Sequence, residues 1–181
     1  VVMPAAKAAI EAKDREIGER TGAITNAAPL WQKGPRRMGA DRRGDAVWVA
    51  EYWTGQLAKI DIHTKKVTEY AVPAAYSHPY AVVVDKNHMV WVSLMNSDRV
   101  ARFDPKTQLT EFYEIPYKDP KNPKSGFSPR GMDVDSKGVV WTPLSSGAYA
   151  SFDRTKCKAK LNGPEAAKGQ HCPEGWTIYN F

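Results

Sequence analysis

Short runs rich in Val, Tyr, Phe and Trp alternate with turn-forming residues along most of the chain. In one stretch the runs YAVVV, MVWVSL, RVARF and LTEFYEI are separated by segments that carry Asp, Asn or Pro. Runs of this length and composition are typical of β-strands, and the segments between them have the chemistry of tight turns. We therefore predict four consecutive short strands for this part of the chain.

The same unit occurs three times in register. The repeated landmarks are Pro35, Pro79 and Pro129; Asp41, Asp85 and Asp135; Trp48, Trp91 and Trp141; and Asp61, Asp104 and Asp153. The tryptophans are 43 and 50 residues apart, a spacing typical of propeller blades. The sequence thus predicts an all-β fold with three four-stranded blades of a larger β-propeller, at about residues 34–76, 77–127 and 128–181.

The repeated tryptophans and aspartates have structural explanations. A Trp in the second strand of each blade would fill the space between neighbouring sheets, where a large aromatic side chain buries the most area. The aspartates lie in segments such as DKNH, DSKG and DPKT, where a carboxylate can cap a turn. Calcium binding would need further oxygen ligands close by, which these segments lack.

Residues 1–33 do not fit the repeat. The stretch PAAKAAIEAKDREIGER contains strong helix formers and has Pro4 near its start, which favours a helix from about residue 4 to residue 19. Gly22 suits the left-handed conformation that often ends a helix. We predict an N-terminal helical arm with a connector over residues 1–33 and a partial propeller over residues 34–181.

Three blades cannot form a closed ring, because propellers close with about four to eight. The outer faces of the first and third blades would each expose apolar surface, which soluble monomers rarely tolerate. We therefore expect that the chain is part of a longer polypeptide or that other chains complete the ring. The first is favoured, because the chain begins with Val1 and ends at a fourth strand.

The two cysteines, Cys157 and Cys172, enclose a polar segment with no strand or helix pattern of its own. We predict a disulfide that closes this loop, and therefore an oxidising location, periplasmic or secreted. The alternative is two free thiols in the cytosol. A zinc site that includes His171 would need two more ligands at a suitable spacing, and the sequence offers none. No apolar run approaches the length of a membrane span, so we predict none.

The chain has a formal net charge of +6, which raises the question of nucleic-acid binding. Its basic residues are spread over predicted turns and do not form a stripe with interleaved aromatic residues. We therefore predict no nucleic-acid partner. One dense basic group lies near the start of the first repeat and consists of Arg36, Arg37, Arg42 and Arg43.

Three segments carry a family resemblance: WVAEYWTGQLAKID, HPYAVVVD and WVSLMNSDRVARFD. Together with SPRGM at the start of the third repeat, they resemble the streptogramin lyase (virginiamycin B lyase) family and its NHL-like propeller relatives, over residues 34–156 and 176–181. The resemblance implies a seven-bladed propeller. For the true lyases it also implies opening of cyclic streptogramin B antibiotics by elimination at an ester bond, with Mg²⁺, histidines and glutamates at the top of the central channel.

The family's functional residues match this sequence only in part. Glu51 matches the acidic residue that follows the family's second strand, and we place Ser93 and Pro143 at that position in repeats two and three. The positions of catalytic histidines hold Arg36, Tyr52, Tyr80 and Arg130. His78 directly precedes Pro79 and is out of register. No His–Glu pair of the lyase kind results, so no cofactor is evident, and Mg²⁺ is expected only if the chain is lyase-like.

We expect any binding site at the channel mouth, where the starts of the first strands meet the loops after the second strands. The candidate residues are Arg36, Glu51, Tyr52, Trp53, His78, Tyr80, Asn96 and Arg130. Two arginines from different blades would attract an anionic ligand, since guanidinium offers a rigid fork of donors. Alternatively, they pair with Glu51 or backbone carbonyls and only tie the blades together. The remaining histidines, His63, His88 and His171, are interpreted as solvent-exposed.

Two functional hypotheses follow. The first is a non-catalytic module of a larger secreted or periplasmic protein, which binds a ligand or serves as an interaction platform. The second is a metal-dependent, streptogramin-lyase-like C–O lyase that acts on a cyclic ester, with catalytic residues partly outside this chain. Fold alone does not choose between them. A further blade with His and Glu at the channel mouth would favour the second.

Overall fold

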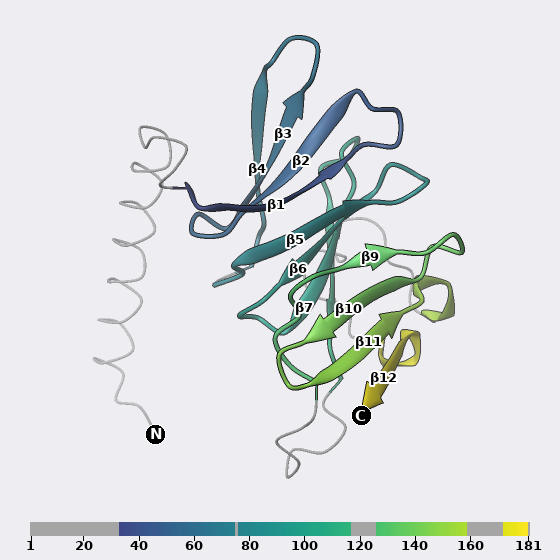
Figure 1. Ribbon diagram of the computed structural model, residues 1–181. Helices are drawn as coiled ribbons and strands as arrows, with labels where there is room; N and C mark the ends of the chain where they lie inside the picture. The colour runs from purple at the N-terminus through teal and green to yellow at the C-terminus, as the bar shows by residue number, and fades with distance from the viewer. Residues whose placement is uncertain (1–32, 75, 117–125, 159–171, 181) are drawn as a thin grey trace, which may run out of the picture.

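The computed structural model describes residues 33–74, 76–116, 126–158 and 172–180, which form three four-stranded antiparallel sheets (Figure 1). The first sheet contains β1 (Pro35–Ala40), β2 (Ala46–Glu51), β3 (Gln56–Asp61) and β4 (Val67–Ala71). The second contains β5 (Pro79–Val84), β6 (Val90–Leu94), β7 (Arg99–Phe103) and β8 (Thr110–Glu114). The third contains β9 (Asp133–Val134), β10 (Val140–Leu144), β11 (Ala148–Phe152) and β12 (Trp176–Asn180).

The three sheets stack as the first, second and third blades of a partial β-propeller. β1 contacts β5 and β5 contacts β9, so the first strands of successive sheets lie side by side. Gly39 in β1 permits this close approach, because a side chain there would meet the backbone carbonyl of Val82 in β5. The predicted propeller with three four-stranded blades is therefore confirmed. The helix predicted for residues 4–19 lies outside the described residues.

Aspartates cap the turns between strands, as predicted. In each turn a carboxylate oxygen of the aspartate accepts a hydrogen bond from the backbone N–H of the residue two positions later. The aspartates are Asp41, Asp61, Asp85, Asp104, Asp135 and Asp153. Asp61 also accepts the N–H of Thr64 at 2.8 Å, and this bond is the largest reason why the pKa of Asp61 is lowered. The bonds satisfy backbone donors that the hairpins leave without a ladder partner.

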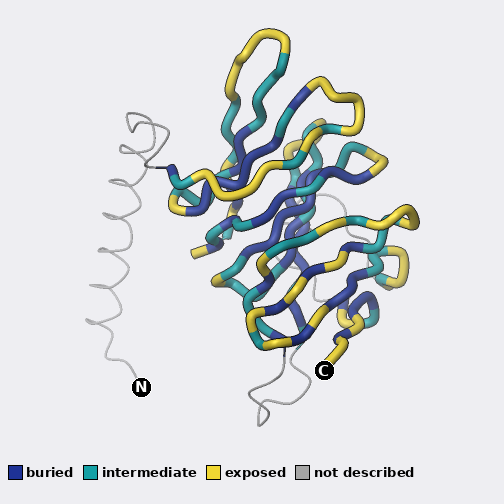
Figure 2. Tube along the Cα trace, viewed as in Figure 1, coloured by how far each residue is buried: buried dark blue, intermediate teal, exposed yellow. Residues whose placement is uncertain are grey.

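An aromatic triad fills each of the two interfaces between blades, where the buried residues lie in Figure 2. In each triad a Trp from the second strand and a Tyr from the fourth strand of one blade meet a Phe from the third strand of the next. The first triad is Trp48, Tyr70 and Phe103, and the second is Trp91, Tyr113 and Phe152, with ring centroids 4.4–6.1 Å apart. These contacts are in the range of favourable aromatic pairs.

The third repeated Trp differs. Trp141 stacks on Tyr179 with centroids 5.6 Å apart, and 39% of its surface remains exposed. The prediction that the repeated tryptophans fill the space between sheets is confirmed for Trp48 and Trp91. It is wrong for Trp141, because no further sheet covers the third blade within the described residues.

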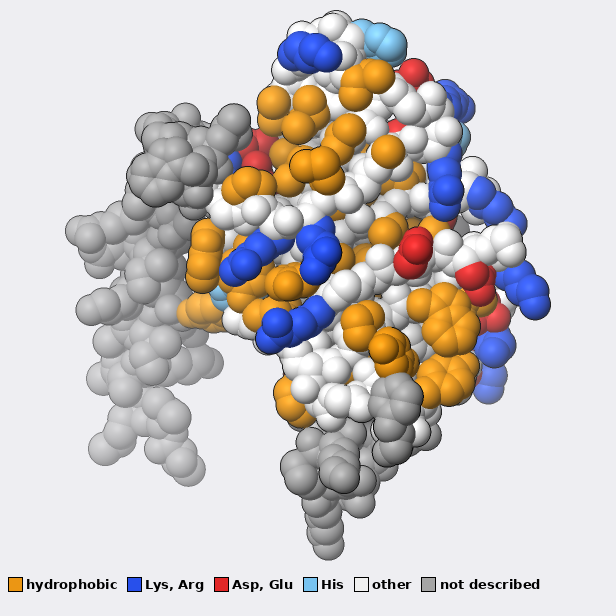
Figure 3. All heavy atoms as spheres, viewed as in Figure 1, with side chains coloured by type: hydrophobic (Ala, Val, Ile, Leu, Met, Phe, Trp, Pro, Cys, Tyr) orange, Lys and Arg blue, Asp and Glu red, His pale blue; other side chains and the backbone are white. Residues whose placement is uncertain are grey.

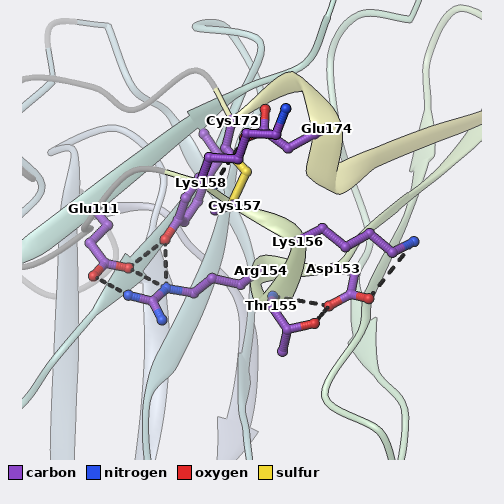
Figure 4. The surroundings of a disulfide bond; sticks show 10 residues. Glu111, Asp153, Arg154, Thr155, Lys156, Cys157, Lys158, Cys172 and Glu174 are labelled. Carbon is purple, nitrogen blue, oxygen red and sulfur yellow. Dashed lines mark hydrogen bonds and ion pairs between the residues drawn. A yellow bond between two sulfur atoms is a disulfide. The ribbon is translucent and has the colours of Figure 1, made fainter.

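The interface between the second and third blades also contains a buried ionic network and a disulfide (Figure 4). Glu111 is 5% exposed and accepts hydrogen bonds from Arg102, Arg154 and the Tyr113 hydroxyl. Burial is the largest reason why the pKa of Tyr113 is raised, followed by the charge of Glu111.

The predicted disulfide between Cys157 and Cys172 is confirmed. It joins the end of a 3₁₀ turn, η2 (Arg154–Lys156), to the start of another, η4 (Pro173–Gly175), which leads directly into β12. The bond therefore fixes the outer strand of the third blade to its neighbour. Within the described residues, no helix has the length and hydropathy needed to cross a membrane.

Candidate functional site

The same backbone geometry occurs at or shortly before the first strand of each of the three described blades. Gly34, His78 and Ser128 each precede a proline and have φ of +63°, +43° and +57°, a region that residues other than glycine rarely adopt. Their carbonyl oxygens accept hydrogen bonds from the backbone N–H groups that follow the second strands, in Tyr52, Met95 and Ser145. The loop after the second strand is thus fixed beside the start of the first strand. His78, which looked out of register in the sequence, occupies the structural position of Gly34.

A β-bulge follows the proline in the first blade. The pairings on either side of it are Pro35 with Glu51 and Met38 with Val49. The second and third blades show the same one-residue shift. Consecutive residues of a regular strand point to opposite faces, whereas a bulge re-aims a side chain. The bulge therefore explains how the consecutive residues Arg36 and Arg37 both reach the same neighbour.

That neighbour is Tyr80, whose ring is surrounded by three arginines. The guanidinium carbons of Arg36, Arg37 and Arg130 lie 5.9, 5.6 and 5.8 Å from the ring centroid. The pKa of Tyr80 is lowered, first because the Arg37 side chain donates a hydrogen bond to it. The positive charges of Arg37 and Arg130 add to this effect, and partial burial opposes it. Figure 3 shows basic side chains gathered over β1 and β5.

Sequence reasoning placed Arg36, Tyr80 and Arg130 at the channel mouth, and the structure brings these three together. It missed Arg37, which was noted only as part of a basic group. The shared GPRR and SPRG starts align Arg36 with Arg130, so only Arg36 has a counterpart in another repeat. No sequence signal marks Arg37, because the proline and the aspartate that flank the first strand are six residues apart in all three repeats and the bulge shows only in the strand register.

Ser93 of the second blade positions Arg130 of the third. Its hydroxyl donates to the backbone carbonyl of Arg130 and accepts the N–H of Ala81 at 3.0 Å, so it links the bulge of one blade to the next. Arg130 Nε in turn donates to the Ser145 hydroxyl at 2.7 Å. Because Ser93 is fully buried, these bonds fix the backbone from which the Arg130 side chain extends.

Glu51 does not join the arginines. It is 3% exposed and accepts a hydrogen bond from the Thr54 hydroxyl at 3.1 Å. Burial raises the pKa of Glu51, and the positive charge of Lys33 partly opposes this rise. No carboxylate of the described residues forms an ion pair with Arg36, Arg37 or Arg130. The pairing with Glu51 that the sequence left open is therefore not found in this part of the chain.

The strand register also corrects the alignment of Glu51. The three prolines at the starts of the first strands pair across the sheet with Glu51, Leu94 and Leu144. The equivalents of Glu51 are therefore leucines, and not Ser93 and Pro143 as the sequence alignment placed them. An acidic residue at this position is found in the first blade alone among the three described here.

An aromatic group borders the arginines. Tyr52 is buried, and its ring centroid lies 4.7 Å from those of both Trp53 and His78 and 6.4 Å from that of Tyr80. The Arg36 guanidinium carbon lies 4.6 Å from the Tyr52 centroid, within the range of a cation–π contact. The His78 ring also contacts the carbonyl of Tyr76 through Nδ1 at 3.0 Å. The six residues Arg36, Tyr52, Trp53, His78, Tyr80 and Arg130 thus form one continuous surface.

The other predicted polar residues lie elsewhere. Asn96 is exposed in the turn between β6 and β7, without a described contact to this surface. His63 is exposed, as expected. His88 was interpreted as solvent-exposed, but its Nδ1 lies 3.2 Å from an Asp41 carboxylate oxygen of the preceding blade, with only 32% of the side chain exposed. His171 lies outside the described residues. Within those residues, no group of three or more His, Cys, Asp or Glu side chains could hold a metal ion.

No protein-family model and no curated protein sequence matches the chain. Its fold resembles a streptogramin B lyase structure, with TM-score 0.63 and 16% identity over 84% of this chain and 42% of that one. It also resembles a catalytically inactive virginiamycin B lyase from Staphylococcus aureus with quinupristin, with TM-score 0.59 and 20% identity over 75% of this chain and 43% of that one.

A third similar structure is the extracellular domain of a hybrid two-component system protein from B. thetaiotaomicron. Its TM-score is 0.52 and its identity 16%, over 67% of this chain and 16% of that one. At this level of identity the three likenesses establish the propeller fold. The chain spans less than half the length of each of these proteins.

Proposed function

We propose that this chain is part of a non-catalytic propeller module that binds a small anionic ligand at the mouth of its channel. The observation that carries the proposal is the group of three guanidinium ions around Tyr80, contributed by the first and third blades. All three arginines are exposed, so a ligand can reach them. No carboxylate of the described residues neutralises them.

An anion would be stabilised here for two physical reasons. Guanidinium groups held close together repel one another, and a carboxylate or phosphate between them relieves this repulsion while it accepts paired hydrogen bonds. The Tyr80 hydroxyl, with its lowered pKa, is also a better donor to an anion than an ordinary phenol. Both effects weaken at high ionic strength, since the site faces solvent.

Calorimetric titration with acetate and with inorganic phosphate at low salt tests the proposal. We expect binding to the parent chain and a loss of affinity of about tenfold or more in Arg37→Ala and Arg130→Ala, because each removes a charged donor. Arg43→Ala is the matched control, since Arg43 is an exposed arginine in the turn beyond the other end of β1. Absence of anion binding, or an equal loss in Arg43→Ala, would contradict the proposal.

The wider setting belongs to the same proposal. Further blades, from the same polypeptide or from other chains, would complete the ring. The disulfide supports a secreted or periplasmic location, because such bonds persist in oxidising compartments. Trapping of thiols with an alkylating reagent in intact source cells tests the location. We expect that the reagent does not label Cys157 and Cys172 unless the disulfide is first reduced. Labelling without reduction would contradict the proposed location.

A metal-dependent, lyase-like enzyme is the alternative, and the fold likeness to streptogramin B lyase favours it. In that case Mg²⁺ would act with residues partly outside this chain. The test is an assay for opening of the quinupristin ester ring with and without Mg²⁺. Ring opening that depends on Mg²⁺ would replace the non-catalytic proposal by this alternative.

A further inference from the structure

Trp53 is an exposed side chain held in a fixed place. It lies in the loop after β2, and 62% of its surface is open to solvent. Its ring nonetheless makes edge-on contacts with two neighbours, Tyr52 at 88° and 4.7 Å and His78 at 87° and 6.1 Å between centroids. Its backbone N–H donates to the carbonyl of Lys33 at 3.2 Å. Because these contacts join the exposed indole to Tyr52 and His78, it is part of a larger aromatic surface of the kind that marks binding sites.

Gly34 explains why the indole lies where it does. The Trp53 ring packs directly over the Gly34 backbone, so a side chain at position 34 would overlap it. Gly34 also has φ of +63°, a conformation in which other residues are strained. Of the three residues that precede the first-strand prolines, only Gly34 is a glycine. It lies where the Trp53 indole packs against the backbone.

The indole adjoins the arginines through a single ring. Tyr52 contacts Trp53 on one side, and on the other it lies beneath the Arg36 guanidinium and 6.4 Å from Tyr80. A ligand held at the arginines by an anionic group could thus place a directly attached ring or chain on Trp53. Tyr52 itself is buried and serves as the floor between the two parts.

We propose that the ligand of this site is an aromatic carboxylate, in which a planar ring is joined to the carboxylate by a short linker. This inference rests on the proposed anion-binding function and adds a second subsite to it. The carboxylate binds at the arginines around Tyr80, beside Arg36, which also contacts Tyr52, and the ring stacks on Trp53. Stacking of a planar ring on a fixed indole is favourable and costs little ordering, because the indole is already immobilised.

Calorimetric titrations with acetate, cyclohexylacetate and phenylacetate test the ring subsite. The parent chain should bind phenylacetate about tenfold more tightly than acetate, as expected for one ring stacked on an aromatic side chain. Cyclohexylacetate, which has similar bulk but no planar face, should gain less. Trp53→Ala should bind all three with the affinity of acetate, whereas Trp53→Phe should keep part of the preference for phenylacetate.

Two further variants separate stacking from general damage. Gly34→Ala should displace the indole and reduce the preference for phenylacetate, with acetate binding retained and folding checked by circular dichroism. Trp141→Ala removes another exposed Trp, on the third blade, and should leave the preference unchanged. Equal affinity of the parent for acetate and phenylacetate, or a preference that survives Trp53→Ala, would overturn the inference. If none of the three carboxylates binds, the proposed anion site, on which this inference rests, would instead be overturned.

Discussion

Trp91 and Trp141 occupy equivalent positions in the second and third blades, yet only Trp91 is buried. Each indole N–H donates to the aspartate six residues earlier, Asp85 at 2.9 Å and Asp135 at 3.1 Å. Each ring also stacks on a tyrosine of the same blade's fourth strand. Trp91 is covered by Phe152 of the next blade and is 2% exposed, whereas Trp141 is 39% exposed.

The comparison separates what a blade encodes by itself from what its neighbour supplies. The strand pattern, the aspartate turn and the Trp–Tyr stack form within one blade, so they are the same in both places. The burial of the indole needs a large apolar side chain from the third strand of the following blade. The aromatic triad is therefore a contact between blades, of which Trp141 and Tyr179 provide two members.

Truncation of the two tryptophans should give the largest difference. Trp91→Ala removes a fully enclosed indole and should lower the free energy of unfolding by about 3 to 5 kcal/mol. Trp141→Ala removes a partly exposed one and should cost about 1 kcal/mol or less. Urea denaturation of both variants measures the difference. Equal losses would show that Trp141 is buried in solution and would break the comparison.

The disulfide is the next largest effect, because it fixes β12 of the third blade. Replacement of both Cys157 and Cys172 by Ser should lower the free energy of unfolding by about 3 kcal/mol, as expected for a bond that closes a loop of 15 residues. The parent chain with a reducing agent should show the same loss, and the double variant should not respond to the reagent. A parent insensitive to reduction would contradict this role.

Local features of this fold and the packing of Trp48 and Trp91 between blades could be predicted from the sequence, whereas the polar contacts between distant segments could not. The aspartate turns and the disulfide follow from residues that are close along the chain or few in number. The pairing of Glu111 with Arg154 joins residues 43 positions apart, and nothing in either repeat marks them as partners. Arg37 was missed for a related reason, because the bulge that re-aims it depends on the strand register. The exposure of Trp141 agrees with the uncovered outer face expected for the third blade, although the repeated Trp taken by itself predicts burial in every blade.

The buried ion network of Glu111, Arg102 and Arg154 lies between the second and third blades. Its loss should have a smaller effect than loss of Trp91 or of the disulfide. Glu111→Gln should lower the free energy of unfolding by about 2 kcal/mol, because Arg154 and Arg102 lose the carboxylate that compensates their desolvation. Both arginines are partly exposed, which keeps the loss below that of a fully buried pair. Glu114→Gln is the control, because its ion pair with Arg99 is about one-third exposed and should contribute at most about 1 kcal/mol. If Glu111→Gln lowers the free energy of unfolding by no more than Glu114→Gln does, the buried network does not stabilise this interface.

Glu51→Gln should have the smallest effect and the opposite sign. Glu51 lies on the face of the first blade where the other two blades carry Leu94 and Leu144, and burial raises its pKa above the usual value near 4.5. A raised pKa means that the folded chain disfavours the ionised form. Below the unfolded pKa the carboxyl is protonated in both states and costs nothing. As the pH rises above the unfolded pKa the unfolded state ionises first, so stability falls until the pH has passed the folded pKa and is constant beyond it.

Glutamine cannot ionise, so Glu51→Gln should be more stable than the parent at neutral pH and equal to it near pH 3, with the difference developing as the pH rises from about 4.5. Urea denaturation at a series of pH values measures this. Glu69→Gln is the matched control on the same face, because Glu69 forms an ion pair with Lys33 and its loss should destabilise the chain at neutral pH. A Glu51→Gln variant less stable than the parent at neutral pH would mean that the carboxylate is stabilised where it lies. The first blade would then accommodate a charge where the other two blades carry leucine. The face of the first blade that carries Glu51 would be polar, in contrast to the face of the third blade that carries Trp141 and Tyr179.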